Sequence, residues 1–210
     1  MLDKKNILIL APHTDDGELG CGATIDKLIE EGNQVYYVAF SACELSVPNG
    51  LPKDILITEV KKATGTLGIK AEHLFLYDYE VRTFGYHRQE ILQNLVDLRK
   101  QLNPDLVFIP SLNDLHQDHY TVAHEALRAF KEISILSYEL PWNNISFNTT
   151  CFIKLSEKNL KQKELALSQY ESQKHRSYAN AEFIRSLART RGVQINTQFA
   201  EVFEVVRWII

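Results

Sequence analysis

Short apolar segments alternate with segments of helical period along the first 130 residues of this 210-residue chain. Apolar runs of strand length occupy residues 6–11, 34–41, 73–77 and 105–111, and helix-length segments follow at 22–31, 57–67, 88–102 and 120–130. This order predicts repeated strand–helix–strand units, which build a mainly parallel sheet covered by helices. Beyond residue 133 we expect strands at 134–139, 151–155 and 200–208 and helices at 157–170 and 181–190. The predicted fold class is therefore α/β.

The composition indicates a globular protein and argues against nucleic-acid-binding and membrane-spanning classes. Hydrophobic residues make up 45% of the chain and charged residues 24%, which is ordinary for a globular protein, and the length predicts a single domain over residues 1–210. The net charge of −4 and the scattered Lys and Arg residues argue against a nucleic-acid partner. No window approaches the ~18 apolar residues of a membrane span, and the N-terminal apolar run is too short for a signal peptide, so we expect a cytoplasmic protein. The three widely spaced cysteines do not form a disulfide pattern.

Two clusters of His and Asp residues follow apolar runs. Residues 13–16 read His-Thr-Asp-Asp after the first run, and residues 116–119 read His-Gln-Asp-His after the fourth. Ligands of parallel α/β sheets bind at the carboxyl ends of the strands, so the two clusters are expected to meet there. A single Asp after a strand is usually a turn residue or a helix cap, but six such groups in two four-residue windows predict a metal site.

A catalytic zinc ion requires about three protein ligands of N or O type and an open position for water. His13, Asp16 and His119 supply that number. The cofactor that this ligand set predicts is one Zn²⁺ per chain, and Fe²⁺ or Co²⁺ could occupy the same ligands.

The remaining residues of the clusters suit the chemistry around such an ion. Asp15, next to Asp16, is placed to act as a general base toward water. His116 is placed to act as a general acid or to stabilise an oxyanion when a carbonyl is attacked. Asp118 is expected to hold the His116 ring in one tautomer.

These residues also carry a family resemblance. The stretch HTDDGELGCGAT resembles the HPDD signature, and HQDH resembles the HPDH signature, of the LmbE-like, PIG-L-type zinc deacetylases. Similarity extends to residues 41–44, to Glu59 with residues 63–68, and to the closing AEVFEVVR, so it covers essentially the whole chain. One departure is Thr14, which stands where the family usually has proline; it removes no ligand.

The resemblance implies a Rossmann-like three-layer sandwich with helices on both faces of the sheet. It implies zinc ligation by His13, Asp16 and His119, a general base at Asp15, and His116 as the electrostatic partner of the tetrahedral intermediate. It also implies removal of the acetyl group from an N-acetylglucosamine-type sugar, a small-molecule substrate that is free or linked to a nucleotide, lipid or thiol. A homo-oligomer is compatible with it.

Several alternatives stay open on the sequence alone. Arg82 falls where family members often present a substrate-contacting arginine, but a surface salt bridge is an equal alternative. Trp142 suits either sugar stacking or core packing, and Glu18 either caps the following helix or braces a ligand. The polar and aromatic stretch 170–178 suits binding of the substrate's leaving portion or of another subunit. The alternative functions are an amidase for a larger acyl group or a sugar–thiol conjugate, and a non-catalytic nucleotide-sugar-binding module.

Overall fold

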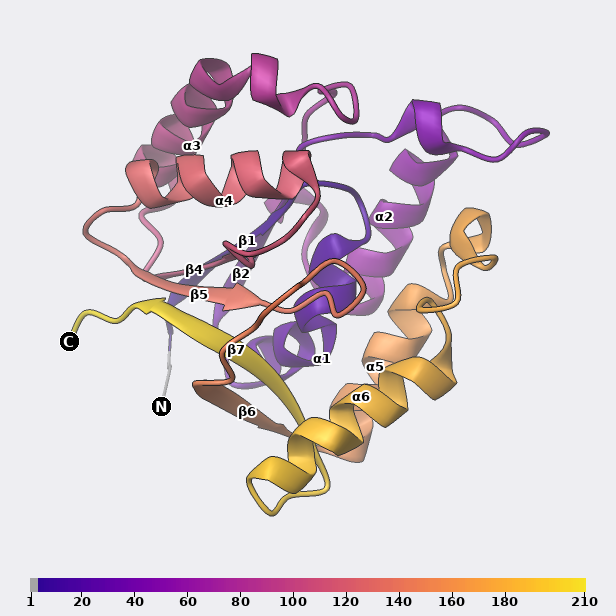
Figure 1. The fold of residues 1–210 in the computed structure, drawn as a ribbon, viewed down its shortest axis with the longest axis vertical. Coiled ribbons are helices and arrows are strands. Elements are labelled where there is room, and N and C mark those ends of the chain that lie inside the picture. The colour runs from indigo at the N-terminus through magenta and orange to yellow at the C-terminus, as the bar shows by residue number, and fades with distance from the viewer. Residues whose placement is uncertain (1–3) are drawn as a thin grey trace.

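The computed structural model describes residues 4–210 as a seven-stranded sheet with helices on both faces (Figure 1). The strands are β1 (Asn6–Ala11), β2 (Gln34–Ala39), β3 (Leu74–Leu76), β4 (Leu106–Pro110), β5 (Ser134–Tyr138), β6 (Cys151–Leu155) and β7 (Phe199–Arg207). Their order across the sheet is β3-β2-β1-β4-β5-β7-β6. The first five strands are parallel, whereas β7 runs antiparallel to both β5 and β6. The prediction of an α/β fold with a mainly parallel sheet is confirmed.

Six α-helices cover the sheet. They are α1 (Asp16–Glu30), α2 (Ile55–Thr66), α3 (Arg88–Leu102), α4 (Gln117–Ala129), α5 (Glu157–Leu167) and α6 (Ala181–Gln194). In β1, Ile7 and Ile9 pack with the side chains of α1, α2 and α5, whereas Leu8 and Leu10 pack with those of α3 and α4. A strand buried on both faces must be apolar throughout, which explains the uninterrupted run at residues 7–11.

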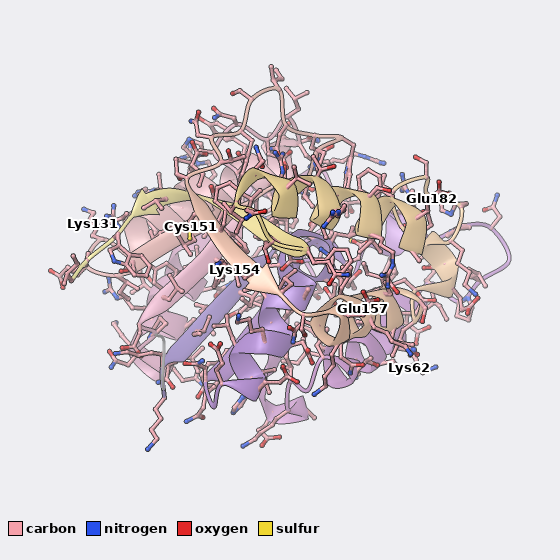
Figure 2. All side chains as sticks on the ribbon, turned by 90° about the horizontal axis from the view of Figure 1, so that it is seen from below. Lys62, Lys131, Cys151, Lys154, Glu157 and Glu182 are labelled. Carbon is pink, nitrogen blue, oxygen red and sulfur yellow. The ribbon has the colours of Figure 1, made fainter. Side chains whose placement is uncertain are left out.

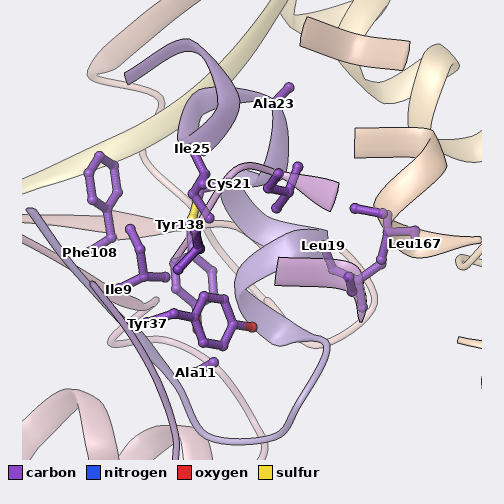
Figure 3. Close-up of a cluster of buried hydrophobic side chains, with 14 of the residues drawn as sticks. Ile9, Ala11, Leu19, Cys21, Ala23, Ile25, Tyr37, Phe108, Tyr138 and Leu167 are labelled. Atoms are coloured by element: carbon purple, nitrogen blue, oxygen red, sulfur yellow. The ribbon is translucent and has the colours of Figure 1, made fainter. Parts of the chain in front are cut away.

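Helix α1 starts six residues earlier than the sequence predicts and is broken inside. Cys21 has non-helical backbone angles, with φ −145° and ψ 23°. A buried ion pair closes the break: Lys163 donates to the carbonyl of Leu19 at 2.6 Å, and the carboxylate of Glu201 accepts from the backbone N–H of Thr24 at 2.7 Å. Figure 3 shows Leu19, Cys21 and Ala23 on this helix, with Leu19 next to Leu167 of α5 and Cys21 next to Tyr138.

The C-terminal part of the chain completes the sheet on one side. Figure 2 shows the edge strand β6, with Cys151 and Lys154, leading toward Glu157 at the start of α5. Cys151 is half-buried and unpaired, and Cys21 and Cys43 are buried free thiols. Within residues 4–210, no helix is long and apolar enough to cross a membrane.

The strand order reverses direction next to β1. The chain passes from β1 to β2 and β3 on one side, and then returns to place β4 on the other side of β1. Such a switch point leaves a crevice at the carboxyl ends of the two central strands, where α/β proteins bind their ligands. Both His/Asp clusters follow these two strands.

Candidate metal centre and active site

The two polar clusters meet at the carboxyl ends of β1 and β4. Residues 13–15 connect β1 to α1, and Asp16 is the first residue of that helix. His116 caps the N-terminus of α4, and Asp118 and His119 lie in its first turn. The structure thus brings together all six residues that the sequence singled out in these clusters.

Three side-chain atoms converge at the centre of the site. His13 Nδ1 lies 3.2 Å from Asp16 Oδ2, His119 Nε2 lies 3.2 Å from the same oxygen, and the two ring nitrogens are 3.1 Å apart. The backbone N–H of His13 also donates to Asp16 Oδ2 at 2.8 Å, which fixes the carboxylate. Ligands of a tetrahedral zinc ion with bonds of ~2.0–2.1 Å lie about 3.3 Å apart, so this spacing fits a metal.

Each of the two imidazole rings lies between two carboxylates. The nitrogens that face away from the centre contact Asp118 and Asp114: His13 Nε2 lies 3.1 Å from Asp118 Oδ2, and His119 Nδ1 lies 2.8 Å from Asp114 Oδ2. With a cation at the centre, each neutral ring would keep its proton on this outer nitrogen, because a carboxylate only accepts hydrogen bonds. The inner nitrogens and the Asp16 oxygen would then present three lone pairs to the cation.

A second grouping of possible ligands is wider. Among the described residues, ligand atoms of His13, His116 and His119 all lie within 4.8 Å of one another. His116 Nδ1 is already occupied, because it accepts the backbone N–H of Asp118 at 3.2 Å. The set that includes Asp16 has the closer spacing.

The carboxylate of Asp118 does not make its expected contact with the His116 ring. Its Oδ2 is 3.9 Å from His116 Nδ1, beyond hydrogen-bond distance. It accepts instead from His13 and from the backbone N–H groups of Arg82 at 2.6 Å and Phe84 at 3.3 Å. The His116 ring is oriented by the backbone of Asp118, not by its side chain, and this leaves the proton of the neutral ring on Nε2.

Burial and neighbouring charges shift the acid–base properties of the site. Burial, together with the charge of Asp16, raises the pKa of Asp15 to about 6. Burial lowers the pKa of His116 to about 4, so its ring is neutral at pH 7. Burial also acts to lower the pKa of His119, but the carboxylates of Asp16 and Asp114 outweigh it and raise that pKa to about 10. The centre therefore favours positive charge.

The loop before α1 is held by two buried tyrosines. The hydroxyl groups of Tyr37 and Tyr170 lie 3.0 and 2.7 Å from the carbonyl oxygen of Thr14. Each hydroxyl also contacts the carboxyl group of Glu18, and its single proton goes either to that group or to the Thr14 carbonyl. Glu18 is fully buried, and burial raises its pKa to about 8. Gly17 is required here because a Cβ would lie 2.5 Å from the Tyr37 ring. Glu18 thus contacts the two tyrosines that hold the loop and makes no contact with a proposed metal ligand.

A pocket of about 500 Å³ opens above the centre. Its walls include Asp15, Arg82 and His116, together with Trp142 and Tyr178. Trp142 stacks flat on Tyr178, with ring centroids 3.8 Å apart and an interplanar angle of 7°, so it both packs and faces the pocket. Arg82 forms no salt bridge with any described residue.

One residue of the site escaped the sequence analysis. Asp114 orients His119, and it also accepts the backbone N–H of His116 at 2.8 Å. The available signal was its position in the loop between β4 and α4.

The stretch 170–178, which the sequence left open as a binding region for the substrate or for another subunit, reaches the pocket. Arg176 and Tyr178 of this stretch line it.

Comparison with known proteins bears on this arrangement. Residues 8–130, which contain both clusters, match the family model described as PIG-L, GlcNAc-PI de-N-acetylase. The chain is 29% identical over 176 residues to the uncharacterized deacetylase YaiS of Escherichia coli, covering 80% of this chain and 92% of that protein. It is 25% identical over 137 residues to the diacetylchitobiose deacetylase of Thermococcus kodakarensis, covering 63% of this chain and 50% of that protein. The structure of the conserved protein TT1542 from Thermus thermophilus matches with a TM-score of 0.79 and 25% identity, over 100% of this chain and 97% of that one.

Proposed function

Because the chain belongs to the PIG-L family of de-N-acetylases and is an enzyme of the deacetylase class, we propose that it hydrolyses the N-acetyl group of an N-acetylglucosamine-type sugar with the help of a bound zinc ion. The observation that carries the proposal is the convergence of three possible ligand atoms within 3.2 Å of one another in a pocket. Water adds to the acetyl carbonyl, the amide C–N bond breaks, and the products are acetate and the free amino sugar.

His13, Asp16 and His119 are the proposed metal ligands. Zinc bound there supplies a Lewis acid for the acetyl carbonyl and lowers the pKa of water toward neutrality, and Fe²⁺ or Co²⁺ would supply the same chemistry. The carboxylates of Asp118 and Asp114 hold the two imidazole rings with their lone pairs toward the ion.

Asp15 and His116 are the proposed proton-handling groups. Asp15 lines the pocket next to the ligand Asp16, so its carboxylate is placed to take a proton from the attacking water and to return it to the departing amine. His116, with Nδ1 accepting from the Asp118 backbone, presents Nε2–H as a donor that stabilises the negative oxygen formed from the carbonyl.

The size of the pocket favours a small substrate. A volume of about 500 Å³ lies within the range of ~300–1,000 Å³ typical of small-molecule sites, and it accommodates an amino sugar with a substituent. Arg82 and the Trp142–Tyr178 pair provide a hydrogen-bond donor and an aromatic face for that substrate. The carrier of the sugar, whether nucleotide, lipid, thiol or none, is what the experiment below identifies.

The test is acetate release by zinc-loaded protein from a panel of free, nucleotide-linked and lipid-linked N-acetylglucosamines. We expect Asp15→Asn to retain zinc and to lose about 10²- to 10⁴-fold in kcat, because it removes the general base. His119→Ala should lose zinc as well, and Asp97→Asn, an exposed carboxylate change, serves as the matched control. Full zinc occupancy in His119→Ala would contradict the ligand assignment.

The same assay distinguishes the alternative functions. Release of longer acyl groups alone would indicate the broader amidase, and sugar binding without any release would indicate a binding module.

A further inference from the structure

Two of the nine arginines in this chain differ from the rest in the hydrogen-bond partners of their guanidinium groups. Seven, at positions 88, 99, 128, 185, 189, 191 and 207, each donate to a carboxylate or a main-chain carbonyl at 3.1 Å or less. The remaining two are Arg82 and Arg176, and both line the pocket above the proposed metal centre. Within the described part of the chain, no carboxylate lies within 4.0 Å of either guanidinium group.

Arg82 is held in a costly backbone conformation. Its φ is +70°, in the left-handed region that a residue with a long side chain rarely adopts. Its backbone N–H donates to Asp118 Oδ2 at 2.6 Å, and the same oxygen lies 3.1 Å from His13 Nε2. One carboxylate thus ties Arg82 to a proposed metal ligand. Such strain is retained where the surroundings enforce it, as at binding sites.

Arg176 approaches the pocket from the opposite end of the sequence. It follows the short 3₁₀ helix Glu171–Gln173, and its Nε lies 3.4 Å from Gln173 Oε1, a long contact. Tyr178, two residues further on, stacks on Trp142 in the wall of the same pocket. Arg176 therefore lines the same pocket as this aromatic pair, and its Nη atoms form no hydrogen bond with any of residues 4–210.

No carboxylate of the site forms an ion pair with either arginine. Asp15 lines the same pocket, and the charge of Arg176 acts to lower the pKa of Asp15, but their charged groups are more than 4.0 Å apart. Asp16 Oδ2 lies between the rings of His13 and His119. Asp114 and Asp118, both buried, are engaged by imidazole and backbone donors. An arginine without a carboxylate in a pocket is suited to a planar or tetrahedral anion, because the guanidinium group donates two parallel hydrogen bonds to it.

We propose that Arg82 and Arg176 bind an anionic group carried by the substrate, so that the preferred substrate is an N-acetylated amino sugar bearing a phosphate or a carboxylate. This inference rests on the proposed function, since it names the class of sugar that the same pocket deacetylates. The reacting acetamide lies at the metal centre, and the anion lies toward the two arginines.

Calorimetric binding to the zinc-loaded Asp15→Asn variant tests the inference without turnover. The probes are N-acetylglucosamine, its 1-phosphate, its 6-phosphate, its uridine diphosphate conjugate and N-acetylmuramic acid, which carries a carboxylate. We expect at least one anionic sugar to bind about 10- to 100-fold more tightly than the neutral sugar, as hydrogen bonds between charged groups predict. The tightest probe distinguishes a sugar phosphate, a nucleotide sugar and a carboxylated sugar.

Arginine variants then show whether Arg82 and Arg176 cause the preference for anionic sugars. In the same background, Arg82→Gln and Arg176→Gln should each reduce the ratio of anionic to neutral affinity about tenfold or more, and Arg176→Lys should restore part of it. Arg189→Gln, which removes an arginine bound to a main-chain carbonyl, is the matched control and should leave the ratio unchanged. Inorganic phosphate is titrated alongside, because phosphate can also bind the metal directly.

The outcomes separate the inference from the function on which it rests. Equal affinity for anionic and neutral sugars, or no binding of any probe, overturns the inference. So does an anion preference that survives in the Arg82→Gln/Arg176→Gln double variant, since the metal would then be the anion site. Acetate release from neutral sugars by the unmodified enzyme, combined with equal affinities, would leave the deacetylase standing and remove only the anionic substrate.

Discussion

Replacing Glu201 by glutamine tests whether a buried ion pair holds the broken helix α1 together. Lys163 Nζ and Glu201 Oε1 are 2.7 Å apart, and their side chains are only 6% and 8% exposed. Glu201 also accepts from the backbone N–H groups of Ala23 and Thr24, and Lys163 donates to the carbonyl of Leu19. Three hydrogen bonds to the backbone on both sides of the break therefore depend on the pair.

The expected loss follows from this geometry. Removing one partner of a buried ion pair costs about 3–5 kcal/mol, because the other charge remains buried and unpaired. In Glu201→Gln the amide oxygen can still accept from a backbone N–H, but the amide NH₂ replaces an acceptor, so Lys163 keeps one of its two partners. We expect the free energy of unfolding to fall by about 3 kcal/mol, a large part of the ~5–15 kcal/mol typical of a folded domain.

Urea unfolding followed by fluorescence measures this change, with equal m-values as evidence that only stability differs. The double variant Lys163→Met/Glu201→Gln should lose less than the sum of the single variants, by about 1–3 kcal/mol, because neither charge is then left alone. Asp97→Asn, which alters an exposed carboxylate 4.0 Å from Lys100, should change stability by no more than about 0.5 kcal/mol. A coupling energy below about 0.5 kcal/mol would refute the reasoning.

Three further predictions address the site and its support. Asp114→Asn should weaken zinc binding about 10- to 100-fold in competition with a chromophoric chelator, whereas Asp97→Asn should not; equal affinities would remove Asp114 from the metal site. Gly20→Ala places a Cβ 2.3 Å from the Tyr138 ring and should destabilise by about 1–3 kcal/mol in urea, while Gly85→Ala, with open space around its Cβ, should be close to neutral; similar losses in both would contradict the packing argument. Removal of metal by a chelator should abolish acetate release and lower Tm, and zinc should restore both; full activity after chelation would exclude a metal-dependent reaction.

The sequence predicts the sheet well but misses the start of α1. The predicted bounds of every parallel strand lie within two residues of its observed ends. Each strand is an apolar run, and β1, β4 and β5 are almost fully buried, whereas the edge strand β3 is partly buried. The segment 16–21 was not assigned to a helix, since Gly17 and Gly20 lower helix propensity. In the structure these glycines allow the rings of Tyr37 and Tyr138 to approach the helix, at positions where a Cβ would lie 2.5 and 2.3 Å away. Tertiary packing overrides the local preference there.

The sequence predicts the clusters of the site but not their internal partners. Position after a strand was sufficient to bring residues 13–16 and 116–119 to one crevice. Whether Asp118 faces His116 or His13 depends on ring orientations that spacing along the chain does not fix, and the carboxylate in fact contacts the residue 105 positions away. The polar composition of residues 170–178 indicates a binding region, but that Arg176 lines this pocket depends on the packing of the C-terminal helices, which the local sequence does not fix.

The break in α1 connects the stability of the fold to the geometry of the site. The helical turn that begins with Asp16 is held at one end by Tyr37 and Tyr170, which bind the carbonyl of Thr14. At its other end the ion pair of β7 and α5 binds the carbonyl of Leu19. A turn fixed at both ends can keep the Asp16 carboxylate between two imidazole rings without relying on the rest of the helix. The closing AEVFEVVR stretch, which contains Glu201, thus supports the proposed metal centre from the far side of the core, although it contributes no residue to the pocket.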